Sequence, residues 1–270
     1  MRRALLFLTV AAGCGSVAAI TDAPPIAVDA AVSDTGLLDG RPSVDLMKGC
    51  VMKALMDEAS WTGTTPPVMN ACGGTTGSVI GLGADTTTDS ERGRVGSFSM
   101  SACVDFASAP ALHGTTGLTM SAWVHPTGLN GEDSNGVISK RNDRGVQSEY
   151  GLFVWTGSKV YVDLGESDRY QGRAQLNNGM WSHLTAVFDS TRPTADRVRL
   201  FINGVADPLD HVTIGTLGDT LPTGDAPLHI GCTPAPASMT QQTFQGQLDK
   251  VSIWNRALSD AEIAALYAER

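Results

Sequence analysis

Hydrophobic and polar residues alternate in short runs from residue 46 onward, and Gly, Asn and Asp separate the runs. Such alternation is typical of β-strands with one buried face, and the separating residues are those that turns favour. Because the helices needed for parallel crossovers are missing from the pattern, it predicts an all-β, antiparallel two-sheet sandwich. We predict strands at Gly49–Met56, Ser78–Leu82, Gly96–Met100, Cys103–Phe106, Leu118–Val124, Gly136–Lys140, Gly151–Trp155, Val160–Leu164, Arg173–Gln175, Ser182–Asp189, Arg197–Ile202, Leu228–Gly231 and Gly246–Trp254.

One helix is indicated, close to the C-terminus. Ser259 and Glu262 have the spacing of a capping box, and Ala261–Ala268 consists largely of good helix formers. We expect this helix to pack onto the sandwich through apolar residues at helical spacing, which are Ile263, Leu266 and Tyr267.

The composition agrees with a β-rich chain, and the net charge argues against one class of partner. Among the 270 residues there are 21 Asp but 7 Glu, and 14 Arg but 5 Lys, so two good helix formers, Glu and Lys, are scarce. The net charge of −9 argues against a nucleic-acid partner, because phosphates bind basic surfaces.

The first residues have the pattern of a secretory signal. The basic start Met1–Arg3 precedes the apolar run Ala4–Ala12, which is too short to span a bilayer. The run ends in small residues before Cys14, which resembles the lipobox of bacterial lipoproteins, although Ala11 stands where Leu is usual. We expect removal of residues 1–13 and a lipid anchor on Cys14 at the outer membrane or cell surface. The alternative is ordinary cleavage and secretion.

The remaining chain divides into a tether and one domain. Residues 14–45 are acidic and rich in Ala and Pro, which predicts a tether, and residues 46–270 are long enough for one large sandwich. Four cysteines in an exported domain predict two disulfides, and the sequence leaves all three pairings open. They are Cys50, Cys72, Cys103 and Cys232.

Several segments follow one another in an order that is more specific than any one of them. They are Leu118–Pro126 (LTMSAWVHP), Trp181–Asp189 (WSHLTAVFD), Arg199–Gly204 (RLFING), Ile230-Gly231 and Phe244–Ser259 (FQGQLDKVSIWNRALS). Together they resemble LamG-like jelly-roll domains of the concanavalin A-like lectin/glucanase superfamily. The resemblance implies a jelly-roll sandwich of two curved antiparallel sheets.

The acidic residues lack the pattern of a glycosidase on this fold. Such enzymes share a strand motif of two glutamates four positions apart with an aspartate between them, which places the acid and the nucleophile on one face. Here the glutamates are isolated from one another, and Glu166 lies three positions after Asp163, on the opposite face of a continued strand. We expect a protein that is not an enzyme.

The hairpin Tyr150–Leu164 is the best candidate for a binding surface. Every second residue along its two strands is aliphatic and should face the core, so the residues between them should face away from it. Aromatic rings beside a carboxylate suit a sugar, whose C–H faces stack while its hydroxyls form hydrogen bonds. We expect ligand contacts from Phe153, Trp155, Tyr161 and Asp163, and from Arg169 and Tyr170 in the loop that follows. The alternative is that a neighbouring loop covers these rings.

Other aromatic residues are expected inside the protein. Trp123, Trp181 and Trp254 lie in strand runs, where large rings are mostly buried. His183 has no nucleophile or orienting acid beside it in the sequence, so we expect a core histidine with satisfied hydrogen bonds.

Two oxygen-rich segments are of the kind that a calcium ion prefers. One supplies Asn130, Glu132, Asp133 and Asn135, and the other is Asp85–Asp89. Such segments also form ordinary turns, which is the alternative.

The sequence as a whole predicts a non-catalytic module at the cell surface. We expect it to bind a glycan or a protein partner on the concave sheet or its rim loops. The alternatives are a structural or adhesion module without a small-ligand site and, third, a glycoside hydrolase with an unrecognised acid pair.

Overall fold

The computed structural model describes residues 44–62, 67–142, 148–165, 168–213, 215, 217–234 and 242–269. These residues belong to one compact unit that begins at Val44. The predicted signal, Cys14 and nearly all of the predicted tether lie outside the described residues. In the described part, no helix has the length and apolar character needed to cross a membrane.

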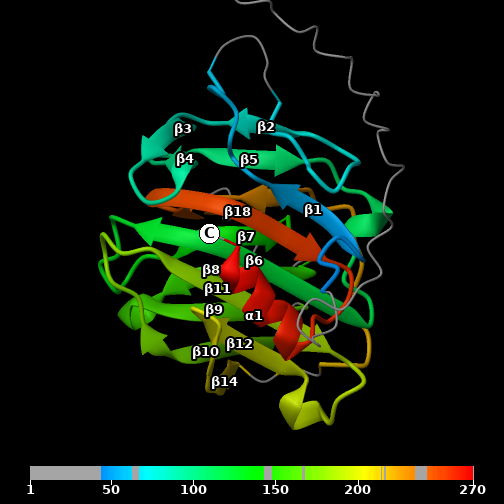
Figure 1. Ribbon diagram of the computed structural model, residues 1–270. Helices are drawn as coiled ribbons and strands as arrows, with labels where there is room; N and C mark the ends of the chain where they lie inside the picture. Colours follow the sequence, from blue (N-terminus) through cyan, green and yellow to red (C-terminus); the bar gives the residue numbers. More distant parts are fainter. Residues whose placement is uncertain are drawn as a thin grey trace, which may run out of the picture. The chain divides into compact units, whose positions relative to one another are not determined.

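The first layer is an eight-stranded antiparallel sheet (Figure 1). Strand β1 (Cys50–Ala54) pairs with β18 beside the main path. The order along that path is β13 (Val205–Asp207), β12 (Val198–Ile202), β11 (Ser182–Asp189), β6 (Gly117–Pro126), β18 (Gly246–Trp254), β4 (Gly93–Phe98) and β3 (Ala84–Asp89).

The second layer is a ten-stranded sheet, in which neighbouring strands are antiparallel except at the parallel bridge between β17 (Gln242–Thr243) and β7. Its order is β14 (Leu209–Thr213), β10 (Asp168–Gln175), β9 (Lys159–Leu164), β8 (Tyr150–Trp155), β7 (Asn135–Lys140), β15 (Leu228–Ile230), β5 (Cys103–Phe106) and β2 (Gly77–Ile80), with β16 (Cys232–Thr233) paired to β17. Three short 3₁₀ turns are η1 (Pro110–Leu112), η2 (Thr156–Ser158) and η3 (Thr194–Asp196).

The main core lies between the two sheets. Leu152 and Val162 from the ten-stranded sheet share one buried cluster with Leu184 and Leu200 from the eight-stranded sheet. The predicted alternation in β8 and β9 is confirmed, because its aliphatic parity belongs to this cluster. Strand β11 is buried on both faces, since every one of its residues except Asp189 is buried.

A second apolar cluster lies on the opposite face of the eight-stranded sheet, under helix α1 (Asp260–Ala268) (Figure 1). Ser259 caps α1 with Glu262 as predicted, through the reciprocal bonds of a capping box. Ile263 and Leu266 of α1 pack there against Trp254 of β18. The helix thus covers part of a sheet face that would otherwise expose apolar side chains to water, and each fully buried one contributes about 1.5–3 kcal/mol.

The structure also corrects the predicted elements. Segment Asp85–Asp89, which we expected as a loop, belongs to strand β3, because its threonines pair along β4. The strand predicted at Arg173–Gln175 begins earlier, at Asp168. A turn at Asn203-Gly204 joins β12 to β13, and both residues have positive φ.

The two expected disulfides are present. Cys50 is bonded to Cys72, and Cys103 is bonded to Cys232. The second bond joins residues 129 positions apart, and a cross-link over such a long loop restricts the unfolded chain strongly.

Candidate functional site

The face of the ten-stranded sheet that points away from the core carries five of the six predicted ligand contacts. They occupy the parity opposite to the core residues of β8, β9 and β10, and Arg141, at the end of β7, joins them. We call this set the arginine–aromatic face: Arg141, Phe153, Trp155, Tyr161, Asp163 and Arg169.

The rings of this face form a short row. The rings of Phe153 and Tyr161 are cross-strand neighbours and stack with their centroids 5.5 Å apart. Trp155 lies 5.5 Å from Tyr161 in a tilted arrangement. The Arg169 guanidinium lies 5.2 Å from the ring centroids of both Phe153 and Trp155. Cation–π attraction therefore holds a positive charge at the edge of the aromatic row.

Asp163 fixes the arginines. Its carboxylate accepts two hydrogen bonds from Arg169, at 2.7 and 2.8 Å, and one from Arg141 Nη2, at 2.9 Å. The hydrogen bonds to Asp163 raise the pKa of Arg169. Gly151 makes room for Arg141, since a Cβ at that position would lie 2.5 Å from Arg141 Nη2. The pairing limits the freedom of both guanidinium groups before any ligand arrives.

The rings of this face are not all exposed, although ligand contacts were expected from each of them. Phe153 and Tyr161 are only 3% and 5% exposed, so they support the surface rather than form it. Trp155 and Arg169 are half-buried and form the accessible part. Trp155 Nε1 donates to the carbonyl of Glu132 at 2.7 Å, which anchors the ring against the 130–135 loop.

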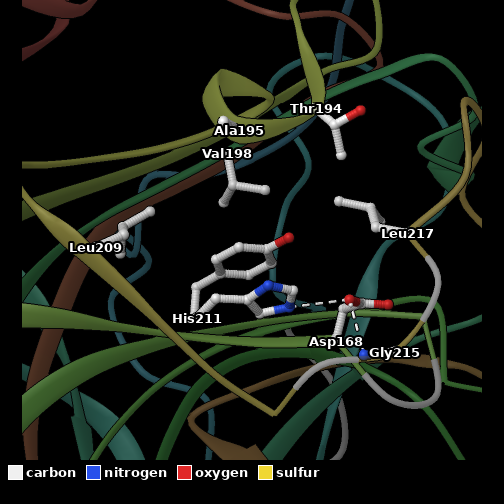
Figure 2. Close-up of a pocket in the computed structure, with 9 residues that line it drawn as sticks. Asp168, Thr194, Ala195, Val198, Leu209, His211, Gly215 and Leu217 are labelled. Atoms are coloured by element: carbon white, nitrogen blue, oxygen red, sulfur yellow. Dashed lines mark hydrogen bonds and ion pairs between the residues drawn. The ribbon is translucent and has the colours of Figure 1, made fainter.

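Tyr170 does not belong to this face. Because Asp168–Gln175 is a strand rather than a loop, consecutive residues point to opposite faces, and Tyr170 packs at the edge of the main core. It lines a cavity of about 660 Å³ (Figure 2). There its ring stacks on His211, with centroids 4.2 Å apart, and burial raises the pKa of Tyr170 to about 12.

The floor of this cavity carries an acid–histidine pair. Asp168 Oδ1 lies 3.0 Å from His211 Nε2 and also accepts a hydrogen bond from the Gly215 backbone (Figure 2). Val198, Leu209 and other aliphatic residues form its walls. The prediction that Tyr170 lies beside Arg169 in a single ligand surface is therefore wrong.

The predicted calcium residues form an Asx turn. Asn130 Oδ1 accepts hydrogen bonds from the backbones of Glu132 and Asp133, and its amide nitrogen donates to the Asp133 carboxylate. The Asn135 amide donates to the backbone of Asp133. Several of the oxygens offered to a metal are thus already used within the loop. Calcium binding here remains a prediction.

Two of the three tryptophans expected inside the protein are buried, Trp254 in the cluster under α1 and Trp123 at 6% exposure, whereas Trp181 is half-buried. Trp123 and Trp181 line a pocket on the same outer face. His183 is buried beside Trp123 and accordingly has its pKa lowered by burial to about 3. Its Nε2 lies 2.9 Å from Ser121 Oγ, but its Nδ1 has no partner in the described part of the chain, so it is only partly satisfied.

Several of these contacts have no local signal in the amino-acid sequence. Arg141 follows β7 and reaches Asp163 on β9 across the sheet, a pairing that no local spacing shows. His211 and Asp168 are brought together only by the pairing of β14 with β10.

The comparisons with known proteins agree with this architecture. Residues 98–264 match the family model Laminin_G_3, described as concanavalin A-like lectin/glucanases superfamily. A search of curated proteins found no match.

Solved structures with a similar fold include two binding domains and one domain of an arabinanase. The binding domain of Paraclostridial Mosquitocidal Protein 1 has a TM-score of 0.58 and 13% identity over 83% of this chain and 52% of that chain. Domain 4 of AbnA, a GH43 extracellular arabinanase from Geobacillus stearothermophilus, in complex with arabinotriose, has a TM-score of 0.55 and 16% identity. The match covers 81% of this chain and 98% of that chain. The binding domain of botulinum neurotoxin DC, in complex with rat synaptotagmin II, has a TM-score of 0.56 and 10% identity. The match covers 83% of this chain and 52% of that chain.

These identities are low, so the similarities show the fold alone, and this chain spans only about half of the two toxin chains. The family match covers more than half of the chain, in the segments that form most of both sheets. The chain therefore belongs to the Laminin_G_3 family of the concanavalin A-like lectin/glucanase superfamily.

Proposed function

We propose that this protein is a non-catalytic binding module that recognises a glycan through its arginine–aromatic face. One observation carries the proposal: the half-buried ring of Trp155 lies beside the Arg169 guanidinium, which Asp163 holds in place. An aromatic ring stacks on the C–H face of a sugar, and a fixed guanidinium donates hydrogen bonds to its hydroxyl or carboxylate oxygens.

The fold supports a binding role. The similar structures include domains named for binding, and one of them is described in complex with an arabinose trisaccharide while another is described in complex with a protein. We favour a glycan over a protein partner because the accessible part of the face is small, comprising one indole ring and one guanidinium. Stable protein interfaces bury about 800 Å² per partner, which is far more than these two side chains provide.

A glycan array tests the proposal. We expect the wild-type protein to bind at least one glycan class, and Trp155→Ala to weaken that binding about tenfold or more, equivalent to about 1.4 kcal/mol. Trp155→Phe, which keeps an aromatic face, should retain part of the affinity.

Two arginines of β10 form a matched pair for the same test. Arg169→Ala should reduce binding, whereas Arg173→Ala should not, because Arg173 pairs instead with Asp210 in an exposed ion pair. An array without any bound glycan would favour the structural or adhesion alternative. Release of reducing sugar from a polysaccharide would contradict the non-catalytic assignment.

The location of the protein is part of the proposal. Two disulfides and a fold found in binding domains fit an exported protein. We infer further that Cys14 carries the lipid anchor of a surface lipoprotein. Labelled palmitate should enter the wild-type protein but not Cys14→Ser, and label in neither protein would sink the lipoprotein assignment.

A further inference from the structure

A second pocket lies on the outer face of the eight-stranded sheet, at the C-terminal end of α1. Its volume is about 420 Å³, which is within the range of small-molecule sites. Its lining comes from five separate regions of the chain: Glu91 and Arg92, Trp123, Trp181, Asn203 and Tyr267. None of these residues belongs to the arginine–aromatic face, which lies on the other sheet.

Three aromatic rings form the walls of this pocket. Tyr267 of α1 stacks on Trp123 of β6, with centroids 5.6 Å apart and an interplanar angle of 26°. Gly204 permits this approach, since a Cβ there would lie 3.0 Å from Tyr267 Cδ1 and its φ is +74°. Trp181 is held by a hydrogen bond from Nε1 to Asp89 at 3.2 Å. The rings are thus fixed by packing.

Arg92 lies between two of these rings. Its guanidinium carbon is 3.9 Å from the Trp123 ring centroid and 5.4 Å from that of Trp181. Its Nε donates to Asp249 at 2.7 Å, and both side chains are nearly fully buried. The aromatic faces therefore already hold an internal cation, and a carboxylate neutralises that cation.

The walls contain donors without acceptors. Arg92 Nη2 and Trp123 Nε1 are buried and have no hydrogen-bond partner in the described part of the chain. A buried donor left without an acceptor costs about 1–3 kcal/mol, and because both atoms have almost no accessible surface, a ligand supplies acceptors to them only where it displaces the side chains that cover them.

The charges around the pocket decide between ligand classes. Arg92 and Asp249 cancel, and the exposed Glu91 at the wall adds a negative charge. Asp89 nearby is ionised, because burial, which raises its pKa, is outweighed by hydrogen bonds from the backbones of Glu91 and Arg92 that lower it. This excess of negative charge disfavours an acidic ligand, and Arg92 already occupies the rings that an organic cation would need.

We propose that this pocket binds one uncharged pyranose unit of a saccharide, independently of the arginine–aromatic face. The accessible surfaces of Trp181 and Tyr267 stack on the C–H faces of the sugar. The Glu91 carboxylate accepts hydrogen bonds from its hydroxyls, and the hydroxyl and ring oxygens supply acceptors to the pocket wall.

Fluorine NMR of fluorotryptophan-labelled protein tests this site separately from the other one. The chain contains 5 tryptophans, and Trp→Phe variants assign their resonances. Trp123 and Trp181 report on the pocket, Trp155 reports on the arginine–aromatic face, and the buried Trp61 and Trp254 report on the integrity of the fold.

The probes are methyl glycosides of glucose, galactose, mannose, xylose and N-acetylglucosamine, with choline and glucuronate as charged comparators. We expect at least one neutral glycoside to shift the Trp123 and Trp181 resonances saturably, while those of Trp61 and Trp254 stay in place. Glu91→Ala should weaken this binding severalfold, whereas Glu132→Ala, an exposed glutamate beside the other face, should leave it unchanged.

Three outcomes would overturn the proposal. In the first, none of the neutral glycosides moves the Trp123 and Trp181 resonances. In the second, only choline or only glucuronate moves them. In the third, Glu91→Ala and Glu132→Ala weaken binding equally while the Trp61 and Trp254 resonances remain native. The Trp155 resonance alone reports whether the arginine–aromatic face binds sugar, so each of the two proposals can be contradicted without the other.

Discussion

The outer faces of the two sheets differ in how their aromatic rings are covered. Both carry aromatic rings that point away from the main core. On the ten-stranded sheet, paired arginines lie over the rings and leave Trp155 and Arg169 partly accessible. On the eight-stranded sheet, α1 covers the apolar part and leaves a pocket at its end. An open face suits the side of an extended glycan, whereas an enclosed pocket suits a single sugar unit.

The largest expected effect comes from removing the carboxylate that fixes the open face. Asp163→Ala leaves the buried Arg141 without its ion-pair partner, and breaking a buried pair costs about 3–5 kcal/mol. Asp210→Ala breaks an exposed Asp–Arg pair on the same sheet and should cost far less, because water and salt screen an exposed ion pair. Denaturant unfolding measures both free energies. Equal costs would show that Asp163 does not organise the face.

Weakening the packing of α1 should affect the pocket on the eight-stranded sheet but not the arginine–aromatic face. Leu266→Ala removes a buried contact of α1, with an expected loss of about 2–5 kcal/mol in the free energy of unfolding. The pocket should lose its Tyr267 wall, while glycan binding through Trp155 persists in the protein that remains folded. Loss of both binding activities at a temperature where the variant is native would mean that the two faces are coupled.

The helix cap gives a smaller and more local perturbation. Ser259→Ala removes the hydroxyl that accepts the Glu262 backbone N–H, and such caps contribute about 1 kcal/mol. Thermal unfolding should show this loss. A variant as stable as the wild type would indicate that packing alone determines where α1 begins.

Acid should weaken the same cap. The hydrogen bond from Arg256, together with those from Ser259, holds the pKa of Glu262 at about 2, below its ordinary value of 4.5, although partial burial opposes this. Because the folded-state pKa is the lower one, this contribution is complete above pH 4.5 and is lost as the pH falls toward 2. Glu262→Gln should therefore flatten the fall in stability over that interval. An unchanged pH profile would contradict the assignment.

Calcium removal should have the smallest effect. The 130–135 loop is closed by its own hydrogen bonds, so a chelator should shift the melting midpoint by less than about 2 °C, which corresponds to at most about 1 kcal/mol for a domain of this size. A larger fall that Asp133→Asn abolishes would instead support the calcium site expected from the sequence.

Local patterns in the sequence predicted much of this molecule. Alternation placed Leu152 and Val162 in the core and Phe153 and Asp163 on the opposite face, because strand geometry converts parity directly into direction. The capping box located the start of α1 for a similar reason, since its bonds join residues three positions apart.

Features that depend on strand pairing could not be predicted in this way. Tyr170 was misplaced because Asp168 was expected in a loop, and extending β10 by a few residues reversed the direction of that side chain. Arg92 meets Asp249 across 157 positions, and only the fold brings the two together. The long, flexible arginine side chains decide how far the rings are covered, and their choice of partner leaves no trace in local spacing.

We infer that Trp155 is the ring of the arginine–aromatic face that contacts the sugar. The most direct test is a fluorine NMR titration of labelled protein with the best glycan from the array. We expect a saturable shift of the Trp155 resonance, the loss of this shift in Arg169→Ala and its retention in Arg173→Ala. A glycan that binds while the Trp155 resonance stays unmoved would contradict the claim.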